Sequence, residues 1–372
     1  MKIICSKAEL LKGVNTVQRA VPSHTTMSVL TCILIDASAG KITLTANNME
    51  LGIETAIDGI IEERGIIALE ARFFSEIVRK LPDNDVTIST QDSLMTTITC
   101  ESAKFSIIGK EASELTRLPY VEKNTAVTIS QFALKEVIRQ TLFAAAVNET
   151  NNKVLTGVLF DICEDRLQVV ALDGHRVALR NLKLHHNYEE NKVIIPGKTL
   201  SEIGRILTGE ADELTDMYFT EELALFEMGD TSVVSRLVEG RYFQIEHFIS
   251  NNYETKISVN KRILMDCIDR SSLFASEADK RPLIVEIYDD HMDLKIRSMI
   301  GSMNEQVPVI KEGKEFRIAF NPKFFGDALR AIDEEEITLY MINEKAPCFI
   351  RDQEESYVYM VLPVNFNESD YA

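Results

Sequence analysis

The segment Leu172–Arg180, LDGHRVALR, sets an acid, a glycine, an imidazole and a guanidinium side by side. Asp173 and His175 could act as a general acid–base pair, and Arg176 could bind an anion. Adjacent residues in a turn point in different directions, however, and the sequence offers no nucleophile motif, metal-ligand spacing or cofactor loop to complete such a site. We therefore expect a protein that is not an enzyme, with no catalytic residue, no bound metal and no cofactor.

A second candidate for chemistry is the GKT triplet at Gly197. A phosphate-binding loop has the pattern GxxxxGK[ST], and Lys192 stands where its first glycine belongs. We interpret Lys198 instead as a residue in the first turn of a helix, facing either solvent or a phosphate group.

The composition indicates a globular protein with more than one domain. The chain has 372 residues, of which 45% are hydrophobic and 26% charged, and a chain of this length usually forms two or three domains. Its six cysteines form no CxxC pair, the N-terminus lacks the pattern of a signal peptide, and no apolar run is long enough to cross a membrane. We expect a cytoplasmic protein with reduced thiols.

An internal repeat organises the chain. A short strand pattern followed by an amphipathic helix pattern begins at Met1, Ala126 and Thr255, and a second copy follows in each segment at Gly65, Lys192 and Glu315. The spacing predicts three similar domains at 1–124, 125–253 and 254–372. Because the connections are short, antiparallel pairing is favoured over parallel crossovers, and we expect an α+β fold with two helices and antiparallel sheets in each domain.

The helices are expected at 7–20, 71–81, 131–145, 197–208, 261–274 and 321–331. Ser6, Ser130, Asn260 and Asn321, the last followed by Pro322, are typical first residues of helices. Alternating runs such as KITLTA, VTISTQ, EITLYM and YVYMVL predict strands between them.

The charge is distributed unevenly. The formal net charge is −18, which by itself argues against binding to nucleic acid. The six predicted helices nevertheless contain 15 basic and 7 acidic residues, a net of +8, which leaves −26 for the rest of the chain. If the repeats are arranged symmetrically, the helices form a basic wall that suits contact with the DNA backbone without base recognition, although each helix alone could simply have a solvated face.

An ordered set of segments carries a resemblance to a known family. LTGVLFD (155–161), ALDGHRVALR (171–180), IIPGKTLSEI (194–203), SRLVEGRY (235–242) and YVYMVLPV near the C-terminus resemble the bacterial sliding clamps, the beta subunits of DNA polymerase III. The resemblance covers the whole chain. It implies the DNA clamp fold and a head-to-tail homodimeric ring that encircles duplex DNA and holds the replicative polymerase, without catalysis and without contact to membranes. It also implies a clamp loader, and other polymerases and repair factors that bind through short peptides.

The resemblance also implies three sets of site residues, for which ordinary core packing or solvation is the alternative. The peptide-binding cleft would contain Leu155, Leu172, Gly174, His175, Arg176, Val177, Phe243, Phe248, Val361, Leu362, Pro363 and Val364. The DNA-facing residues would be His24, Arg72, Arg79, Lys80, Lys135, Arg139, Lys198 and Arg205. At the dimer interface, Phe105 and Ile107 of one chain would face Leu273 and Phe274 of the other.

The chain departs from the family pattern at several of these places. Phe243, Glu246 and His247 make one wall of the expected cleft more aromatic and less basic, and Asn365 stands where an arginine is frequent. The tail NFNESDYA continues past the usual ending. His24 replaces a frequent arginine, so its contact with DNA would be weaker at neutral pH.

Two other classes of function are weighed against the clamp. An enzyme that uses Asp173 and His175 would lose its activity in His175→Ala while its partners still bound. A peptide-docking scaffold without a DNA role would show equal retention on linear and circular DNA.

Overall fold

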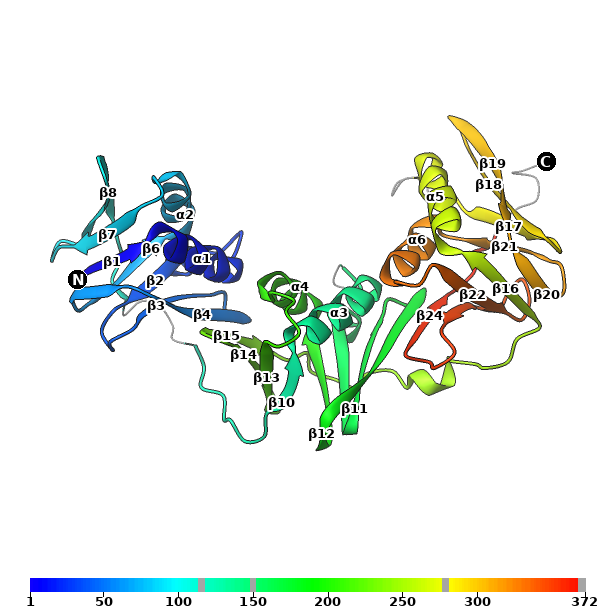
Figure 1. Ribbon diagram of the computed structural model, residues 1–372, viewed down its shortest axis with the longest axis horizontal. Helices are drawn as coiled ribbons and strands as arrows, with labels where there is room; N and C mark the ends of the chain where they lie inside the picture. Colours follow the sequence, from blue (N-terminus) through cyan, green and yellow to red (C-terminus); the bar gives the residue numbers. More distant parts are fainter. Residues whose placement is uncertain (113–117, 148–151, 276–280, 367–372) are drawn as a thin grey trace. The chain divides into compact units, whose positions relative to one another are not determined.

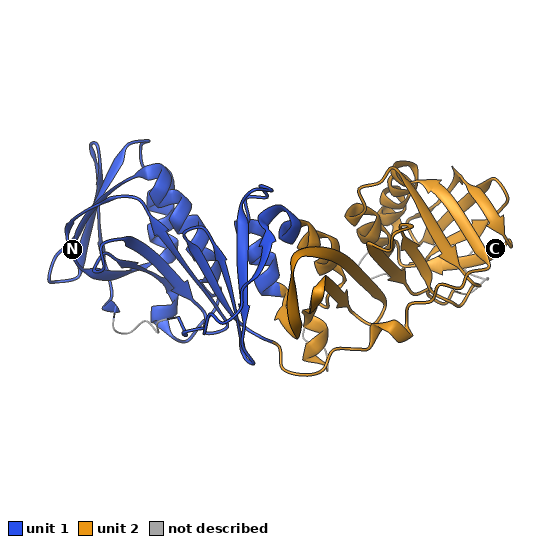
Figure 2. Ribbon diagram, turned by 60° about the horizontal axis from the view of Figure 1, so that its bottom comes forward, with its two compact units in different colours: residues 1–135, 198–237 blue, residues 136–197, 238–372 orange. Residues whose placement is uncertain are grey.

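The computed structural model describes residues 1–112, 118–147, 152–275 and 281–366, which form two compact units (Figure 2). Unit 1 is Met1–Lys135 with Lys198–Leu237, and unit 2 is Glu136–Gly197 with Val238–Ala372. The division passes through the expected central domain, because some of its strands pair with N-terminal strands and others with C-terminal strands.

Six α-helices lie in the described residues, where the repeat predicts them (Figure 1). They are α1 (Lys7–Val17), α2 (Ala71–Lys80), α3 (Gln131–Thr141), α4 (Gly197–Ile206), α5 (Lys261–Ser271) and α6 (Pro322–Ala331). Three of them continue into a short 3₁₀ turn, namely η1 (Gln18–Ala20) after α1, η4 (Leu142–Ala144) after α3 and η7 (Ser272–Phe274) after α5. The predicted helical segments are therefore confirmed to within a few residues at each end.

The predicted helix starts are also confirmed. A side-chain oxygen of each predicted first residue accepts a hydrogen bond from a backbone N–H in the first turn, which satisfies a group that the helix itself leaves unpaired. Ser6 accepts from Glu9 at 3.2 Å, Ser130 from Ala133 at 3.2 Å, Asn260 from Ile263 at 3.1 Å and Asn321 from Lys323 at 3.0 Å.

Unit 1 contains two sheets, and their strand pairs are antiparallel, as expected. The five-stranded sheet has the order β5 (Ile60–Glu63), β1 (Lys2–Ser6), β7 (Asp85–Thr90), β8 (Met95–Cys100) and β9 (Ala103–Ile108). The eight-stranded sheet has the order β10 (Val127–Ser130), β13 (Leu214–Phe219), β14 (Leu223–Met228), β15 (Thr231–Arg236), β4 (Leu51–Ile57), β3 (Ile42–Asn47), β2 (Cys32–Asp36) and β6 (Ile66–Glu70).

Within the larger sheet, β15 pairs with β4, and this pair joins two distant parts of the sequence. Thr231 lies opposite Thr55, and their hydroxyl groups are 2.8 Å apart. α1 packs against β4 and against α2 (Figure 1). The apolar face of each helix is therefore buried inside unit 1, which leaves the opposite, charged face exposed.

Unit 2 also contains two antiparallel sheets. The seven-stranded sheet has the order β11 (Gly157–Leu172), β12 (Arg176–Pro196), β24 (Tyr357–Val361), β23 (Cys348–Arg351), β22 (Glu336–Met341), β16 (Thr255–Asn260) and β20 (Ile310–Gly313). The four-stranded sheet has the order β19 (Gly301–Pro308), β18 (His291–Ser298), β17 (Leu283–Ile287) and β21 (Arg317–Phe320). The long hairpin of β11 and β12 meets the C-terminal strand β24 through the pair Arg176–Val361.

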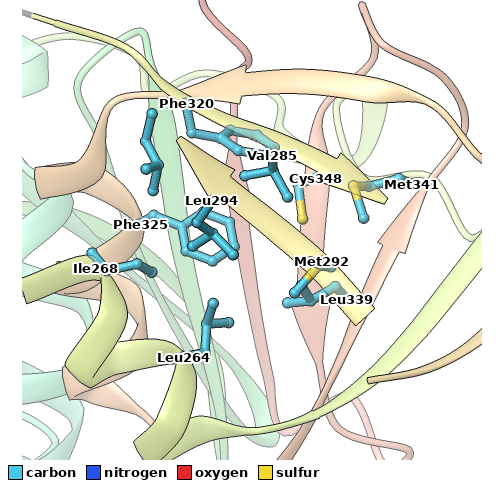
Figure 3. A pocket seen from close by; sticks show the side chains of 11 residues that line it. Leu264, Ile268, Val285, Met292, Leu294, Phe320, Phe325, Leu339, Met341 and Cys348 are labelled. Atoms are coloured by element: carbon cyan, nitrogen blue, oxygen red, sulfur yellow. The ribbon is translucent and has the colours of Figure 1, made fainter. Parts of the chain in front are cut away.

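α5 and α6 pack side by side in unit 2, and their apolar faces close the core between the sheets. Figure 3 shows a small cavity there, lined only by apolar side chains such as those of Leu264, Phe320 and Phe325. A cavity without polar groups offers no hydrogen bond that could orient a ligand. We regard it as a packing feature of the core.

Candidate functional site

The residues that resemble a catalytic group form the turn of the β11–β12 hairpin. Leu172 lies opposite Val177, and Asp173 Oδ1 accepts hydrogen bonds from the backbone N–H groups of His175 at 2.9 Å and Arg176 at 3.2 Å. Gly174 has φ +90°, a conformation that side-chain-bearing residues rarely adopt. The carboxylate of Asp173 therefore holds the turn, which is a structural role.

Arg176 lies beneath this turn with its side chain only 7% exposed. Its Nε donates to Asp173 Oδ2 at 3.0 Å, its Nη1 to Asp327 Oδ2 at 2.7 Å, and its Nη2 to the carbonyl oxygen of Phe143 at 2.5 Å. Its guanidinium also lies over the rings of Phe324 and Phe143, at 4.5 Å and 5.4 Å from their centroids. The sequence predicted that Arg176 is displayed for a peptide, whereas the structure directs its three nitrogens to groups of its own chain.

An apolar cluster lies on the face of the hairpin that carries Val177, and we call it the hairpin cluster. Of the predicted cleft residues, Leu172 and Val177 are buried in it, and Leu155 and Leu362 pack against it from outside. Its other buried members are Val154, Leu159, Val170, Leu179, Ile194, Ile245, Phe349, Val358 and Met360, and Val238, Tyr242, Ile249 and Tyr340 are partly buried against it. Four predicted residues from three separate segments thus meet at one place.

Other predicted cleft residues lie around or behind the cluster. Val361 is 1% exposed and lies opposite Arg176 in the sheet, so its side chain shares the face of Arg176 rather than that of Val177. Phe243 and Phe248 are exposed, while their neighbours Tyr242, Ile245 and Ile249 make the apolar contacts. Burial raises the pKa of the Tyr242 phenol.

The remaining predicted cleft residues form the edge next to α6. Gly174 and His175 are exposed at the turn, and the His175 ring stacks on Phe324 with centroids 5.8 Å apart. The backbone N–H of Leu362 donates to the carbonyl oxygen of His175 at 2.9 Å. Pro363 and Val364 are half-buried, and Val364 donates to Ala319 at 2.8 Å. The last strand is thereby held against the turn.

Sequence reasoning missed Phe324 and Asp327, which hold Arg176 from α6. The repeat contained a signal for Asp327, since α2, α4 and α6 share an acid followed three residues later by an arginine. The acids are Glu76, Glu202 and Asp327, and the arginines are Arg79, Arg205 and Arg330. Each acid is paired with the arginine of its own helix.

Several of the predicted DNA-facing residues are exposed on the helices of unit 1. Arg72, Arg79 and Lys80 lie on α2, and Lys198 and Arg205 lie on α4; His24 is exposed in the segment between η1 and β2. Glu76 pairs with both Arg79 and Lys80, and Glu202 pairs with Arg205. These carboxylates, which the net charge of +8 already includes, partly neutralise the cations beside them.

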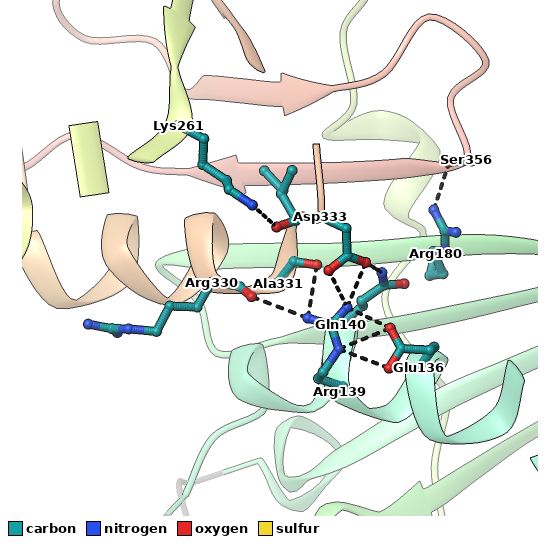
Figure 4. A network of polar contacts seen from close by, with 10 residues as sticks. Glu136, Arg139, Gln140, Arg180, Lys261, Arg330, Ala331, Asp333 and Ser356 are labelled. Atoms are coloured by element: carbon teal, nitrogen blue, oxygen red, sulfur yellow. Dashed lines mark hydrogen bonds and ion pairs between the residues drawn. The ribbon is translucent and has the colours of Figure 1, made fainter. Parts of the chain in front are cut away.

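Arg139 and Lys135, also predicted to face DNA, donate to groups of their own chain. Arg139 Nη2 lies 2.8 Å from Asp333 Oδ2, and its Nη1 donates to the carbonyl oxygens of Arg330 and Ala331 at the end of α6 (Figure 4). The hydrogen bonds that Arg139 donates to Glu136 raise the pKa of Arg139. Lys135 Nζ donates to Leu207 and Thr208 at the end of α4. Both cations therefore cap helix C-termini, where positive charge is favourable.

The residues predicted for a dimer interface lie at or near two sheet edges. β9, with Phe105 and Ile107, ends the five-stranded sheet of unit 1, and Phe105 is exposed. β19 ends the four-stranded sheet of unit 2, and η7 packs against it with Leu273 exposed and Phe274 half-buried. Sheet edges with unpaired backbone groups and exposed apolar side chains are suited to pairing with another chain.

Family models match the chain along nearly its whole length. Residues 1–119 match the N-terminal domain of the DNA polymerase III beta subunit, residues 128–244 match its central domain, and residues 247–365 match its C-terminal domain. The chain belongs to the family of DNA polymerase III beta subunits, the bacterial sliding clamps. Members of this family are non-catalytic processivity factors of DNA replication, and this is the function of the chain. The family forms dimeric rings.

Individual relatives agree with this assignment. The beta sliding clamp of Staphylococcus aureus strain Mu50 is 34% identical over 375 residues, which cover 98% of this chain and 99% of that protein. A putative DNA polymerase III beta subunit from Eubacterium rectale is 59% identical with a TM-score of 0.94, covering 98% of this chain and 100% of the other. The Bacillus subtilis sliding clamp is 34% identical with a TM-score of 0.94, covering 99% and 100%. The expected fold class, three tandem clamp domains with antiparallel sheets, is confirmed.

No helix in the described parts of the chain is long and apolar enough to cross a membrane.

Proposed function

We propose that two copies of the chain form a head-to-tail ring around duplex DNA and hold the replicative polymerase by a short peptide bound at the hairpin cluster. The observation that carries this proposal is the meeting of Leu155, Leu172, Val177 and Leu362 in one apolar cluster, in a chain of the sliding-clamp family. Clamp loader, other polymerases and repair factors would use the same surface.

The peptide would be held mainly by apolar contacts. Exposed Phe243 and Phe248 adjoin a segment whose neighbours pack into the hairpin cluster, so aromatic or aliphatic peptide side chains could extend the cluster outward. Burying one Leu or Phe anchor contributes about 1.5–3 kcal/mol. Since the donors of Arg176 are directed to its own chain, we propose that Arg176 supports this surface from beneath, beside His175 and Gly174 at the turn, rather than contacting the peptide.

DNA would be contacted through its backbone by exposed cations, with Arg72 and Lys198 the strongest candidates. Both lie in the first turn of their helices, at the same position of the repeat, and both are exposed. Arg79, Lys80 and Arg205 would contribute less because of their acidic partners. Enclosure in a ring, rather than affinity, would keep the protein on DNA.

Ring closure would join β9 of one copy to β19 of the other. Phe105 and Ile107 would pack against Leu273 and Phe274 of the second copy, and the backbone groups of the two edges would pair.

We propose domain boundaries after residues 124 and 253; the three family-model ranges, which end or begin close to these positions, support them. A replication factor whose six cysteines are free is expected in the cytoplasm.

A topological experiment tests the ring. Protein loaded by its clamp loader onto circular DNA should be retained at moderate salt and released when the circle is cut once. Equal retention on circular and linear DNA would exclude encirclement.

A further inference from the structure

The carboxylate of Asp327 is shared by two arginines with different surroundings. Its Oδ2 lies 2.7 Å from Nη1 of Arg176, and its Oδ1 lies 3.2 Å from Nη1 of Arg330. Arg176 is buried on the face of the hairpin opposite the hairpin cluster, whereas Arg330 is half-exposed on α6 and also pairs with Asp269 of α5. One carboxylate thus connects Arg176, which supports the proposed peptide surface, to Arg330, a solvent-exposed cation of α6.

The same arrangement occurs a second time, in unit 1. Glu202, which holds the place of Asp327 in α4, lies 3.1 Å from Nη1 of Arg19 and 2.9 Å from Nη1 of Arg205. The side chains of Glu202 and Asp327 are 22% and 21% exposed, while that of Glu76, the third member of the repeat, is 46% exposed. We call Glu202 and Asp327 the forked carboxylates, because each joins an arginine of its own helix to an arginine from an earlier part of the chain.

A shared carboxylate makes its two arginines interdependent. The charge of Asp327 attracts both guanidinium groups, and they repel each other across it. If a DNA phosphate draws Arg330 away, Asp327 interacts more strongly with Arg176, which is weakly solvated because it is buried. Arg176 in turn fixes Phe324, the ring on which His175 stacks at the edge of the hairpin cluster.

We propose that Asp327 is a positioning residue that couples DNA contact on α6 to peptide binding at the hairpin cluster. The inference rests on the proposed peptide surface. A phosphate that displaces Asp327 and Asp269 from Arg330 commits Asp327 to Arg176 and rigidifies the surface that receives the peptide. By linkage, a bound peptide releases Arg330 for phosphate to the same extent. The expected coupling is a roughly two- to fivefold tighter peptide complex when DNA is present, within the range found for networks of this kind.

The test measures the affinity of one peptide in the presence and absence of DNA. A fluorescent peptide that copies the C-terminal tail of the cognate replicative polymerase is titrated with the full-length protein at low salt, alone and with a saturating short linear duplex. The native protein should bind the peptide several-fold more tightly with DNA. In Asp327→Asn this ratio should fall to one, because the amide no longer attracts either arginine.

Two further variants separate coupling from simple damage. Arg330→Gln removes the cation that competes for Asp327, so its peptide affinity without DNA should already equal the native affinity with DNA, and the ratio should be lost. Asp266→Asn removes one exposed carboxylate from the neighbouring helix α5 and should keep the ratio. Thermal melting of each variant checks that it is folded.

Each outcome has a defined meaning. A native protein that binds no peptide contradicts the proposed peptide surface. A native protein that binds peptide equally with and without DNA, or an Arg330→Gln variant that retains the native ratio, overturns the coupling while leaving the peptide surface intact.

Discussion

Nη1 of Arg176 lies 2.7 Å from Oδ2 of Asp327, although the two residues are 151 positions apart in the chain. The contact ties the turn of the β11–β12 hairpin to α6. It also explains why a segment with the residue types of an active site has no catalytic role. Its arginine pairs with two carboxylates, Asp173 and Asp327, and its aspartate closes a turn.

Replacing Arg176 should destabilise the protein. Arg176→Ala leaves Asp173 and Asp327 partly buried without their shared cation, and we expect the free energy of unfolding to fall by about 2–4 kcal/mol. Arg176→Lys keeps the charge but loses the three-way hydrogen bonding and the stacking. Its free energy of unfolding should fall by roughly half as much. Urea unfolding at pH 7 measures both. A lysine variant as stable as the native protein would show that charge alone suffices.

Gly174 should tolerate other residues poorly. With φ +90° and no neighbouring atom within 4 Å of an added Cβ, the cost of Gly174→Ala is one of backbone strain alone. We expect a loss of about 1–2 kcal/mol, and a smaller loss for Gly174→Asn, since asparagine adopts such conformations more readily. In thermal melting, the melting temperature should be highest for the native protein, lower for Gly174→Asn and lowest for Gly174→Ala.

Arg139 and Arg72 should differ in their effect on DNA binding. Arg139→Ala removes a cap from α6 and should lower stability by about 1 kcal/mol, with little change in the dependence of DNA affinity on salt. Arg72→Ala should leave stability nearly unchanged and reduce the slope of log affinity against log salt by about 0.9 for each phosphate that the protein no longer neutralises. Fluorescence anisotropy over a series of salt concentrations distinguishes them. The assignment fails if Arg139→Ala reduces the slope as much as Arg72→Ala.

Glu286 on β17 should make stability depend on pH. Its carboxylate receives contacts from Lys295 at 2.5 Å and Arg317 at 2.6 Å. Burial acts to raise the pKa of Glu286, but the hydrogen bond and charge of Lys295, with smaller contributions from Tyr288 and Arg317, lower it overall. Because the pKa is lower in the folded state, this stabilisation is complete above the pKa of an unfolded glutamate and is lost as the pH falls through the folded-state value.

Glu286→Gln should therefore cost about 1–3 kcal/mol at neutral pH and much less at about pH 3. Urea unfolding at the two pH values gives the difference. Glu315→Gln, at an exposed position, provides the control and should change stability little at either pH. A cost of Glu286→Gln that is the same at both pH values would contradict the assigned ion pairs.

The proposed ring closure should be sensitive to one exposed leucine. Leu273→Asp places a charge at the expected contact between copies and should produce a monomer of 42.0 kDa in sedimentation experiments. Ile310→Asp is a matched control, because Ile310 on β20 is 73% exposed and Leu273 is 74% exposed. If both variants remained dimeric, Leu273 would not lie in the contact.

Local features could be predicted from the sequence, whereas long-range polar contacts could not. The starts of α1 and α6 follow from Ser6 and Asn321, because a helix cap depends on residues within one turn. Arg139 was assigned to DNA because an exposed arginine on a basic helix carries no mark of its partner. Asp333 is 194 positions away, and only the packing of α3 against the end of α6 brings the two together.

The same limit applies to the candidate peptide surface. The family resemblance predicts that Leu172, Val177 and Leu362 lie together, and they meet in one apolar cluster, but it could not decide which residues of the segment after Gly240 point inward. Tyr242, Ile245 and Ile249 do so, while Phe243 and Phe248, which flank the short 3₁₀ turn η6 (Ile245–His247), are exposed. Val361 belongs to the opposite face of the sheet, a consequence of strand alternation that register alone determines.

In the proposed ring, the contacts between neighbouring domains, which we call joints, would differ in their sensitivity to ionic strength. Two joints lie within each chain and contain a forked carboxylate, and the others lie between the copies. Arg19, Phe143 and Leu273 hold the same position in η1, η4 and η7, so the joint between copies would have a leucine where the joint in unit 1 has an arginine. Dissolved salt screens the partly exposed pair of Arg19 with Glu202 more than the buried pair of Arg176 with Asp327, and it does not weaken apolar contacts. A high ionic strength would therefore weaken the contact of Arg19 with Glu202 in unit 1 before it weakened the contact of Arg176 with Asp327 in unit 2 or the proposed apolar contact between copies.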